Sequence, residues 1–189
     1  MNNRILETNA RSTFVDEGPD AAAGPSVAAA RYAAAHAGRR NRIGLLLPAL
    51  RALVELGAAR LRHSRFHVRD IERLNRDAAA RGRSAMEAAP KDFDIAARIA
   101  YVIPRVARRL PFRSDCVPQA MAGQRWLLSK GIASTIVIGV DLPGDKIFNA
   151  HAWLQYGGSA IIGGNVTRFS PLFGTDDDER RRIREVREP

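Results

Sequence analysis

The chain has 189 residues and a formal net charge of +10, with 46% hydrophobic and 26% charged residues. This length suits one domain, or one domain with an extension. The hydrophobic fraction is sufficient for a buried core and excludes wholesale disorder. The single cysteine, Cys116, excludes a disulfide framework within the chain and argues against a cysteine-rich zinc finger.

Hydropathy argues against a membrane span and against secretion. The most apolar stretch, residues 43–50, is interrupted by Pro48 and closed by Arg51, far short of the roughly 20 apolar residues that cross a bilayer. The first 18 residues contain no apolar segment of the kind that a secretory signal requires. We therefore expect a cytoplasmic protein whose thiol is reduced.

The positive charge is concentrated in the first part of the chain. Residues 1–110 hold 20 basic and 11 acidic side chains, net +9, whereas residues 111–189 hold 10 and 9, net +1. Aromatic residues are only 6% and do not alternate with the arginines as they do in RNA-binding surfaces. We predict solvated faces of arginine-rich helices, with a docking surface for an acidic peptide or partner protein as the main alternative.

The first part of the sequence predicts helices. Residues 1–42 are expected to be a flexible extension, weakly helical at residues 27–37, because turn-forming residues separate their apolar positions. Further helices are predicted over residues 43–61 and 69–80, and a third begins near Asp92 or Asp94 as its N-cap. The expected apolar face of the helix at residues 43–61 is Leu46, Leu50, Leu53, Val54 and Leu61.

After residue 115 the predicted elements change from arginine-rich helices to one helix followed by strands. A helix is predicted over residues 116–130, then a strand at 132–140 and a hairpin of strands at 150–156 and 159–162, with Gly157 and Gly158 in the turn. The fold class is therefore α+β, with a small antiparallel sheet preceded by arginine-rich helices. We expect a helical subdomain plus core over residues 43–175 and a charged tail at 176–189.

Cys116 is placed at the start of a helix. Ser114 and Asp115 are both good N-caps, and Pro118 is tolerated only in a first helical turn. Unpaired backbone N–H groups and the helix dipole favour a thiolate there, so we expect the pKa of Cys116 to lie below the ordinary value of about 8.5. The alternative is a buried thiol that only fills space.

His151 is the candidate base for such a nucleophile. His36, His63 and His67 lie in the arginine-rich part and are expected to face solvent, whereas His151 lies inside a predicted strand, two residues before Trp153. A nucleophile and its base are often far apart in sequence. The alternative is a core or surface histidine without a catalytic role.

The order of these features resembles the transglutaminase-like and papain-like cysteine proteases. The closer resemblance is to the lasso-peptide leader peptidases, the McjB-like proteins, and covers roughly residues 93–171. It rests on the combination of five segments: Phe112-Arg113-Ser114-Asp115-Cys116, Leu127-Leu128-Ser129-Lys130-Gly131-Ile132, Val137-Ile138-Gly139-Val140, Ala150-His151-Ala152-Trp153, and the Gly157-Gly158 turn.

The resemblance implies proteolytic removal of a leader from a ribosomally made precursor peptide, with Cys116 as nucleophile and His151 as base. It implies three partners: the precursor peptide, a separate leader-binding protein and an ATP-dependent lasso cyclase. No metal or other cofactor, no nucleic acid and no membrane is expected. Two alternatives stay open: an acyltransferase that uses an amine in place of water, and a non-catalytic basic adaptor.

The sequence departs from the family at one position. The family usually has an Asp twelve residues after the histidine, and this position is Gly163. A three-residue hairpin loop at 156–158 would pair positions 151 and 163, but glycine offers no side chain to hold the imidazole. Asn165 is the tentative third catalytic residue, since it would lie on the same strand face, and Gly163→Asp would then return the acid. Otherwise, a Cys–His dyad would be oriented by water or by a backbone carbonyl.

Overall fold

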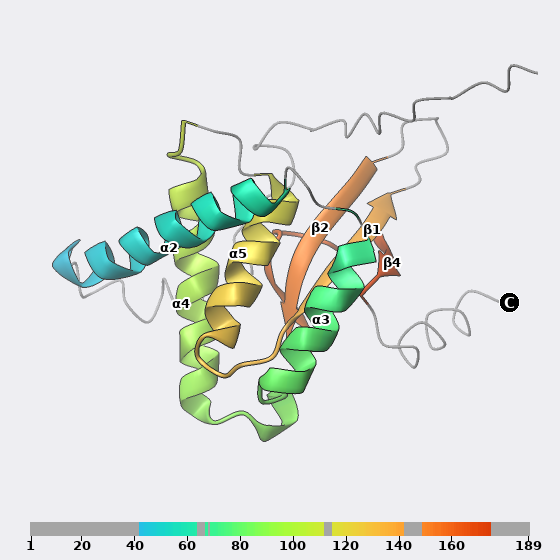
Figure 1. Ribbon diagram of the computed structural model, residues 1–189, viewed down its shortest axis with the longest axis horizontal. Helices are drawn as coiled ribbons and strands as arrows, with labels where there is room; N and C mark the ends of the chain where they lie inside the picture. Colours follow the sequence, from blue (N-terminus) through green and yellow to red (C-terminus); the bar gives the residue numbers. More distant parts are fainter. Residues whose placement is uncertain (1–41, 64–66, 68, 112–114, 142–148, 175–189) are drawn as a thin grey trace, which may run out of the picture.

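The computed structural model describes residues 42–63, 67, 69–111, 115–141 and 149–174 (Figure 1). The predicted extension at 1–42 (apart from its last residue), its helix at 27–37 and the charged tail at 176–189 lie outside these residues. The helices are α2 (Arg42–His63), α3 (Arg69–Arg81), the short 3-10 helix η1 (Ala85–Glu87), α4 (Pro90–Ala107) and α5 (Cys116–Leu128). The strands are β1 (Thr135–Asp141), β2 (Asn149–Tyr156), β3 (Ser159–Ile162) and β4 (Ser170–Phe173).

The molecule is a helical layer packed on one antiparallel sheet. The strand order is β3-β2-β1-β4, and every neighbouring pair is antiparallel. Helix α5 packs directly against the sheet, α4 packs beside α5, and α2 crosses over both (Figure 1). The α+β prediction is confirmed, and the predicted helices agree with α2 to α5 to within a few residues.

The two faces of the sheet carry separate apolar clusters. The main core lies between the sheet and the helices, and its large members, such as Ile103, Leu127 and Leu154, are completely buried. A smaller cluster of Val137, Trp153 and Phe169 covers the opposite face. The alternation of β2 therefore directs Ala152 and Leu154 to the helices, and His151 and Trp153 to the smaller cluster.

Helix α2 packs through a different face from the predicted one. Ala52, Leu56 and Ala59 are buried against α4 and α5, because the small alanines let the helices approach closely. Glu55 is buried on the same face, where the guanidinium nitrogens of Arg51 and Arg125 lie 2.6 and 3.1 Å from its two oxygens. The predicted apolar face is instead on the outside, 41 to 76% exposed: Leu46, Leu50, Leu53, Val54 and Leu61.

The start of α4 also differs from the prediction. Neither Asp92 nor Asp94 is the N-cap, since α4 begins at Pro90, and Ala89 takes that place. Asp92, in the third helical position, accepts a hydrogen bond from the Ala89 N–H at 3.0 Å and pairs with Arg83 at 3.3 Å. Its carboxylate reaches back from the first turn to cap the helix, because Ala89 has no polar side chain to do so. Pro90 is accommodated in the same turn, where its missing N–H has no helical partner.

The hairpin joining β2 and β3 has a two-residue turn of Gly157 and Gly158, as the predicted strand ends require, and not the three-residue loop that would pair positions 151 and 163. Tyr156 pairs with Ser159, and Gly157 and Gly158 have φ of +58° and +74°, as a tight hairpin turn requires. A bulge at Ile161 then shifts the register of the two strands by one residue.

Strand β4 was not predicted from the sequence, and Pro171 lies inside it. Proline is accommodated at the edge of a sheet, where its missing N–H faces away from the neighbouring strand. β4 pairs only with the second half of β1. Beyond it, the side-chain amide of Asn75 on α3 bonds both the N–H and the C=O of Ile136, at 2.8 and 2.9 Å, and so takes the place of a strand.

Candidate active site

Cys116 is the first residue of α5, as the sequence predicts. The residue before it, Asp115, has extended backbone and occupies the N-cap position. The thiol is only partly exposed and packs against the main core. Two backbone N–H groups of the first helical turn, those of Cys116 and Val117, lie close enough to the sulfur to stabilise its thiolate form.

A pair of glycines opens the edge of β2 to this thiol. Strand β3 ends at Ile162, opposite Leu154, because Gly163 and Gly164 have φ of +118° and +71° and leave the extended conformation. Ala152 lies two residues before Leu154 in β2 and therefore has no β3 residue opposite its backbone. Its N–H donates to the sulfur of Cys116, which replaces the missing strand partner.

The imidazole of His151 is held on the other face of β2. Its ring stacks on Phe169 with a centroid distance of 4.9 Å, and its Nε2 lies 2.8 Å from the carbonyl oxygen of Gly163. A carbonyl oxygen only accepts hydrogen bonds, so Nε2 carries the proton. The neutral ring therefore has its lone pair on Nδ1, which is the atom available to act as a base.

The sulfur of Cys116 contacts the backbone of the residue next to His151. The sulfur accepts from Ala152, which directly follows His151 in the chain. Within the part of the chain that the structure describes, no hydrogen bond joins the sulfur to the ring itself. The contacts between catalytic groups are often longer in a free enzyme than in its substrate complex.

The electrostatics of the thiol differ from the expectation. Burial raises the pKa of Cys116, and the carboxylate of Asp115 raises it further. The N–H groups of Ala152, Val117 and Cys116 lower it but do not reverse the direction. The predicted depression of the pKa is therefore wrong for this structure, because loss of water around the sulfur outweighs the helix N-terminus.

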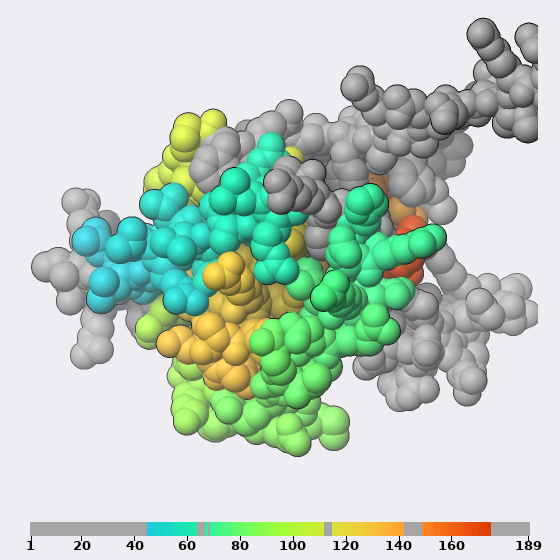
Figure 2. All heavy atoms as spheres, in the orientation of Figure 1, coloured from blue at the N-terminus to red at the C-terminus, as the bar shows by residue number. Residues whose placement is uncertain are grey.

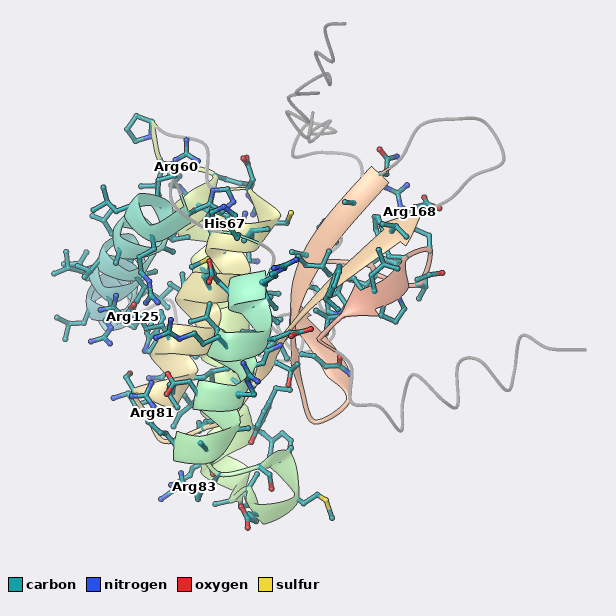
Figure 3. The ribbon with its side chains drawn as sticks, turned by 45° about the vertical axis from the view of Figure 1, so that its right-hand side comes forward. Arg60, His67, Arg81, Arg83, Arg125 and Arg168 are labelled. Carbon is teal, nitrogen blue, oxygen red and sulfur yellow. The ribbon has the colours of Figure 1, made fainter. Side chains whose placement is uncertain are left out.

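The pKa of His151 is lowered, chiefly by burial. The hydrogen bond to Gly163 opposes this shift, and the positive charge of Arg168 adds to it. Arg168 lies beside the sheet (Figure 3), with its guanidinium carbon 4.9 Å from the Phe169 ring centre and its Nε 3.5 Å from a carboxylate oxygen of Asp141. With the pKa of Cys116 raised and that of His151 lowered, both groups are uncharged near neutral pH.

Gly163 is the residue that orients His151, although it has no side chain. A Cβ built at this position would lie 2.5 Å from Trp153 Cβ, and its φ of +118° disfavours any other residue. The Oδ1 of Asn165 accepts hydrogen bonds from the Thr167 N–H and hydroxyl at 3.1 and 2.8 Å. The structure thus places the Gly163 carbonyl at the ring nitrogen, and Asn165 in a local turn.

The structure describes two of the other three histidines, His63 and His67. His67 is exposed, whereas His63 is half-buried and not fully solvent-facing as expected. Burial and Arg60 lower the pKa of His63, and Asp115 opposes this. His36 lies outside the described residues.

Three residues of the site were not singled out by sequence reasoning: Ala152, Phe169 and Arg168. Ala152 acts through its backbone, and Phe169 stacks on His151 from a distant part of the chain on the same face of the sheet. No sequence motif marks either residue. The Phe169 contact depends on the segment that leads into β4, a strand that was not predicted from the sequence.

A cysteine at the start of a helix, packed on an antiparallel sheet that carries a histidine, is the arrangement of thiol-dependent acyl-transfer enzymes. Residues 49–174 match the Transglutaminase-like superfamily, and the chain belongs to this superfamily. Membership supports a function of the cysteine-protease or acyltransferase type. No curated protein and no solved structure matched the chain. Among the described residues, no helix has the length and apolar character to cross a membrane.

Proposed function

We propose that the protein is a cysteine peptidase that removes the leader from a ribosomally made, lasso-type precursor peptide. The observation that carries the peptidase assignment is the meeting of the Cys116 sulfur with the backbone next to His151, whose Nδ1 lone pair is free. The superfamily supports thiol chemistry, and the substrate class rests on the resemblance of residues 93–171 to the lasso-peptide leader peptidases.

Before the reaction, the thiol of Cys116 and the imidazole of His151 are both uncharged. As the sulfur attacks the scissile carbonyl, the thiol proton passes to Nδ1 of His151, and the carbonyl oxygen becomes an oxyanion. The C–N bond then breaks, the imidazolium protonates the leaving amine, and an acyl-enzyme thioester remains on Cys116. Water attacks the thioester with His151 as base, which releases the acid and restores the thiol.

The start of α5 supplies donors for the oxyanion. The N–H groups of Cys116 and Val117 lie near the sulfur and have no partner within their own helix. Fixed backbone donors of this kind stabilise a developing negative charge without reorganisation. The partners that follow from this proposal are the precursor peptide, a separate leader-binding protein and an ATP-dependent cyclase, and the reaction is placed in the cytoplasm.

The test is cleavage of a lasso-type precursor in the presence of a leader-binding protein, followed by mass spectrometry. The wild-type protein should release the leader, whereas Cys116→Ala and Cys116→Ser should lower the rate by at least about a thousandfold, since they remove the nucleophile. Circular dichroism should show both variants to be folded. Release of the leader by Cys116→Ala at the wild-type rate would exclude the cysteine peptidase.

The same spectra separate hydrolysis from acyl transfer. With a primary amine present at high concentration, a peptidase yields mainly the free carboxylic acid, and an acyltransferase yields mainly the amide. A basic adaptor without catalysis would yield neither product.

A further inference from the structure

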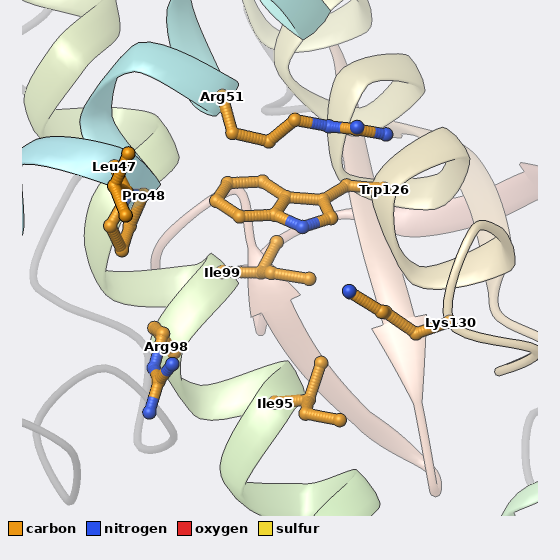
Figure 4. Close-up of a pocket in the computed structure, with 8 residues that line it drawn as sticks. All are labelled: Leu47, Pro48, Arg51, Ile95, Arg98, Ile99, Trp126 and Lys130. Carbon is orange, nitrogen blue, oxygen red and sulfur yellow. The ribbon is translucent and has the colours of Figure 1, made fainter.

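The apolar outer face of α2 continues into a cavity between helices. The cavity has a volume of about 410 Å³ and is lined by residues of α2, α4 and the end of α5 (Figure 4). Trp126 lies between Arg51 and Ile99 in this view, and Leu47 of α2 also lines the cavity. Trp126 is ten residues after Cys116 in α5, about 15 Å along the helix axis. The cavity is therefore separate from the active site.

The charged side chains that line the cavity are all basic. Arg51, Arg98 and Lys130 line it, and none of its eight described lining residues is acidic. Arg51 shares the buried carboxylate of Glu55 with Arg125, so two guanidinium groups face one carboxylate and one positive charge remains in excess. The exposed charged side chains described on α2 itself are all basic, because its one acidic residue is Glu55.

The apolar surface is larger than the cavity. Leu46, Leu47 and Leu50 are 70%, 76% and 58% exposed on the outer side of α2. On a helix these positions lie close to one another, with Val54 one turn further on. In Figure 2, α2 forms a ridge on the surface beside the end of α5. A helix that is apolar on both faces is typical of one that is covered on both.

We propose that the cavity and the outer face of α2 form a docking site for an acidic, amphipathic helix of a protein partner. One apolar side chain of the partner would enter the cavity and contact Trp126, and its neighbours would cover the leucines of α2. Acidic side chains beside them would meet the exposed Lys130 at the rim. The inference concerns binding and does not depend on the proposed peptidase function.

Charge and shape favour this occupant over two others. A second copy of the chain would place this basic helix, with Arg51, Arg60 and Arg62, against an equally basic helix, and the like charges repel. A bilayer would attract the same arginines, but a flat surface cannot fill a hollow between three helices. A side chain that protrudes from a folded protein partner can fill this hollow.

The test uses short, fluorescently labelled synthetic helices and the full-length protein. The first probe carries leucines at helical spacing with glutamates between them. The second has lysines in place of the glutamates, and the third has serines in place of the leucines. By fluorescence anisotropy at low salt, the first should bind at least about tenfold more tightly than either of the others, and its affinity should fall as salt screens the charges.

Matched variants locate the binding. Lys130→Glu and Leu47→Ser should each weaken binding of the first probe about fivefold or more. Arg73→Glu, on α3, makes the same change of charge, and Met86→Ser removes an isolated apolar side chain that is 98% exposed. Both controls should bind like the wild type. Leu47, Met86 and the two charged residues are exposed, so thermal unfolding should be unchanged in all four.

Three results would overturn the proposal. Equal weakening by Lys130→Glu and Arg73→Glu would show attraction by net charge alone. A wild-type dimer in sedimentation that Leu47→Ser dissolves would assign the face to a second copy. Flotation with anionic phospholipid vesicles that is lost in Leu47→Ser, without selective binding of the acidic helix, would assign it to a membrane.

Discussion

Gly163 contributes a carbonyl group where related proteins are expected to use a carboxylate. A carbonyl fixes the tautomer and position of His151 through Nε2 but carries no full negative charge to stabilise the imidazolium. The pKa of His151 is lowered chiefly by burial, and no carboxylate among the described residues contributes to offset this shift. The base is therefore a neutral imidazole at ordinary pH.

The role of Gly163 can be separated from that of Asn165 by two substitutions. Gly163→Ala should lower kcat by about tenfold or more with a small change in KM, because a Cβ there meets Trp153 and moves the carbonyl away from His151. Asn165→Ala should change kcat by less than about twofold, since its side chain bonds only Thr167 among the contacts described.

The reverse outcome, with Asn165→Ala impaired and Gly163→Ala normal, would restore Asn165 as the third catalytic residue. Gly163→Asp is not expected to rescue either variant, because its backbone φ of +118° disfavours an aspartate. Thermal unfolding of each variant serves as the control for folding.

The thiol of Cys116 should titrate above its ordinary pKa. Burial disfavours the thiolate, so the rate of alkylation by iodoacetamide should reach half its maximum above pH 8.5 or so. Cys116 is the single cysteine, so the modified residue is unambiguous, and the urea-unfolded chain provides the reference. Asp115→Asn should lower the midpoint, because the Asp115 carboxylate raises the pKa. A wild-type midpoint below that of the unfolded chain would contradict the structure.

At the scale of elements, one buried carboxylate joins α2 to α5. Glu55 is 1% exposed and is approached by Arg51 from its own helix and by Arg125 from α5. Arg125→Met should lower the free energy of unfolding by about 1–3 kcal/mol, since it leaves a buried carboxylate with one partner in place of two. Arg125 is itself half exposed, so solvent screening keeps the loss below that of a fully buried pair.

The matched control is Arg81→Met on α3. Arg81 pairs with Asp77 one turn away, and both side chains are exposed. Its loss should change the free energy of unfolding by less than about 0.5 kcal/mol. Urea unfolding of the two variants followed by circular dichroism gives the comparison. Equal effects would show that Glu55 is solvated in solution and does not hold the helices together.

At the scale of the whole molecule, the site makes stability depend on pH. The pKa of His151 is lowered on folding, so the unfolded state binds more protons below about pH 6.5 and stability is lost as the pH falls through that range. The pKa of Cys116 is raised on folding, so stability is lost as the pH rises above about 8.5. The free energy of unfolding should therefore be greatest between these limits.

Urea unfolding at a series of pH values measures both limbs. His151→Gln should reduce the slope between pH 5 and 6.5 or so, where the carboxylates are still largely ionised, and Cys116→Ser should reduce the slope above about pH 8.5. The half-buried His63 contributes to the acid limb in the same direction and stays in place in both variants. Wild-type slopes in both variants would show that neither buried group titrates as the structure requires.

The positive charge of the molecule is distributed over several surfaces. Arg60, Arg81, Arg83 and Arg125 are spread over the helical side, and Arg168 lies at the sheet (Figure 3). This spread agrees with the expectation of solvated faces on arginine-rich helices. The basic side chains that would attract the proposed acidic partner are those beside the cavity next to α2.

The sequence by itself determined the helices, the central hairpin, and the positions of Cys116 at a helix start and His151 inside a strand. These features depend on local chemistry: caps, periodic apolar residues and β-branched runs act over a few neighbouring residues. The α+β class followed from their order along the chain.

Only the tertiary structure decided which face of α2 is buried, where β4 pairs, and what holds His151. Two apolar faces on one helix are equivalent in sequence, and packing against α4 and α5 selects the one with small residues. The direction of the Cys116 pKa depends on how much water the fold removes from the sulfur. The partner of His151 is a backbone carbonyl, which every residue possesses and which no side-chain motif can reveal.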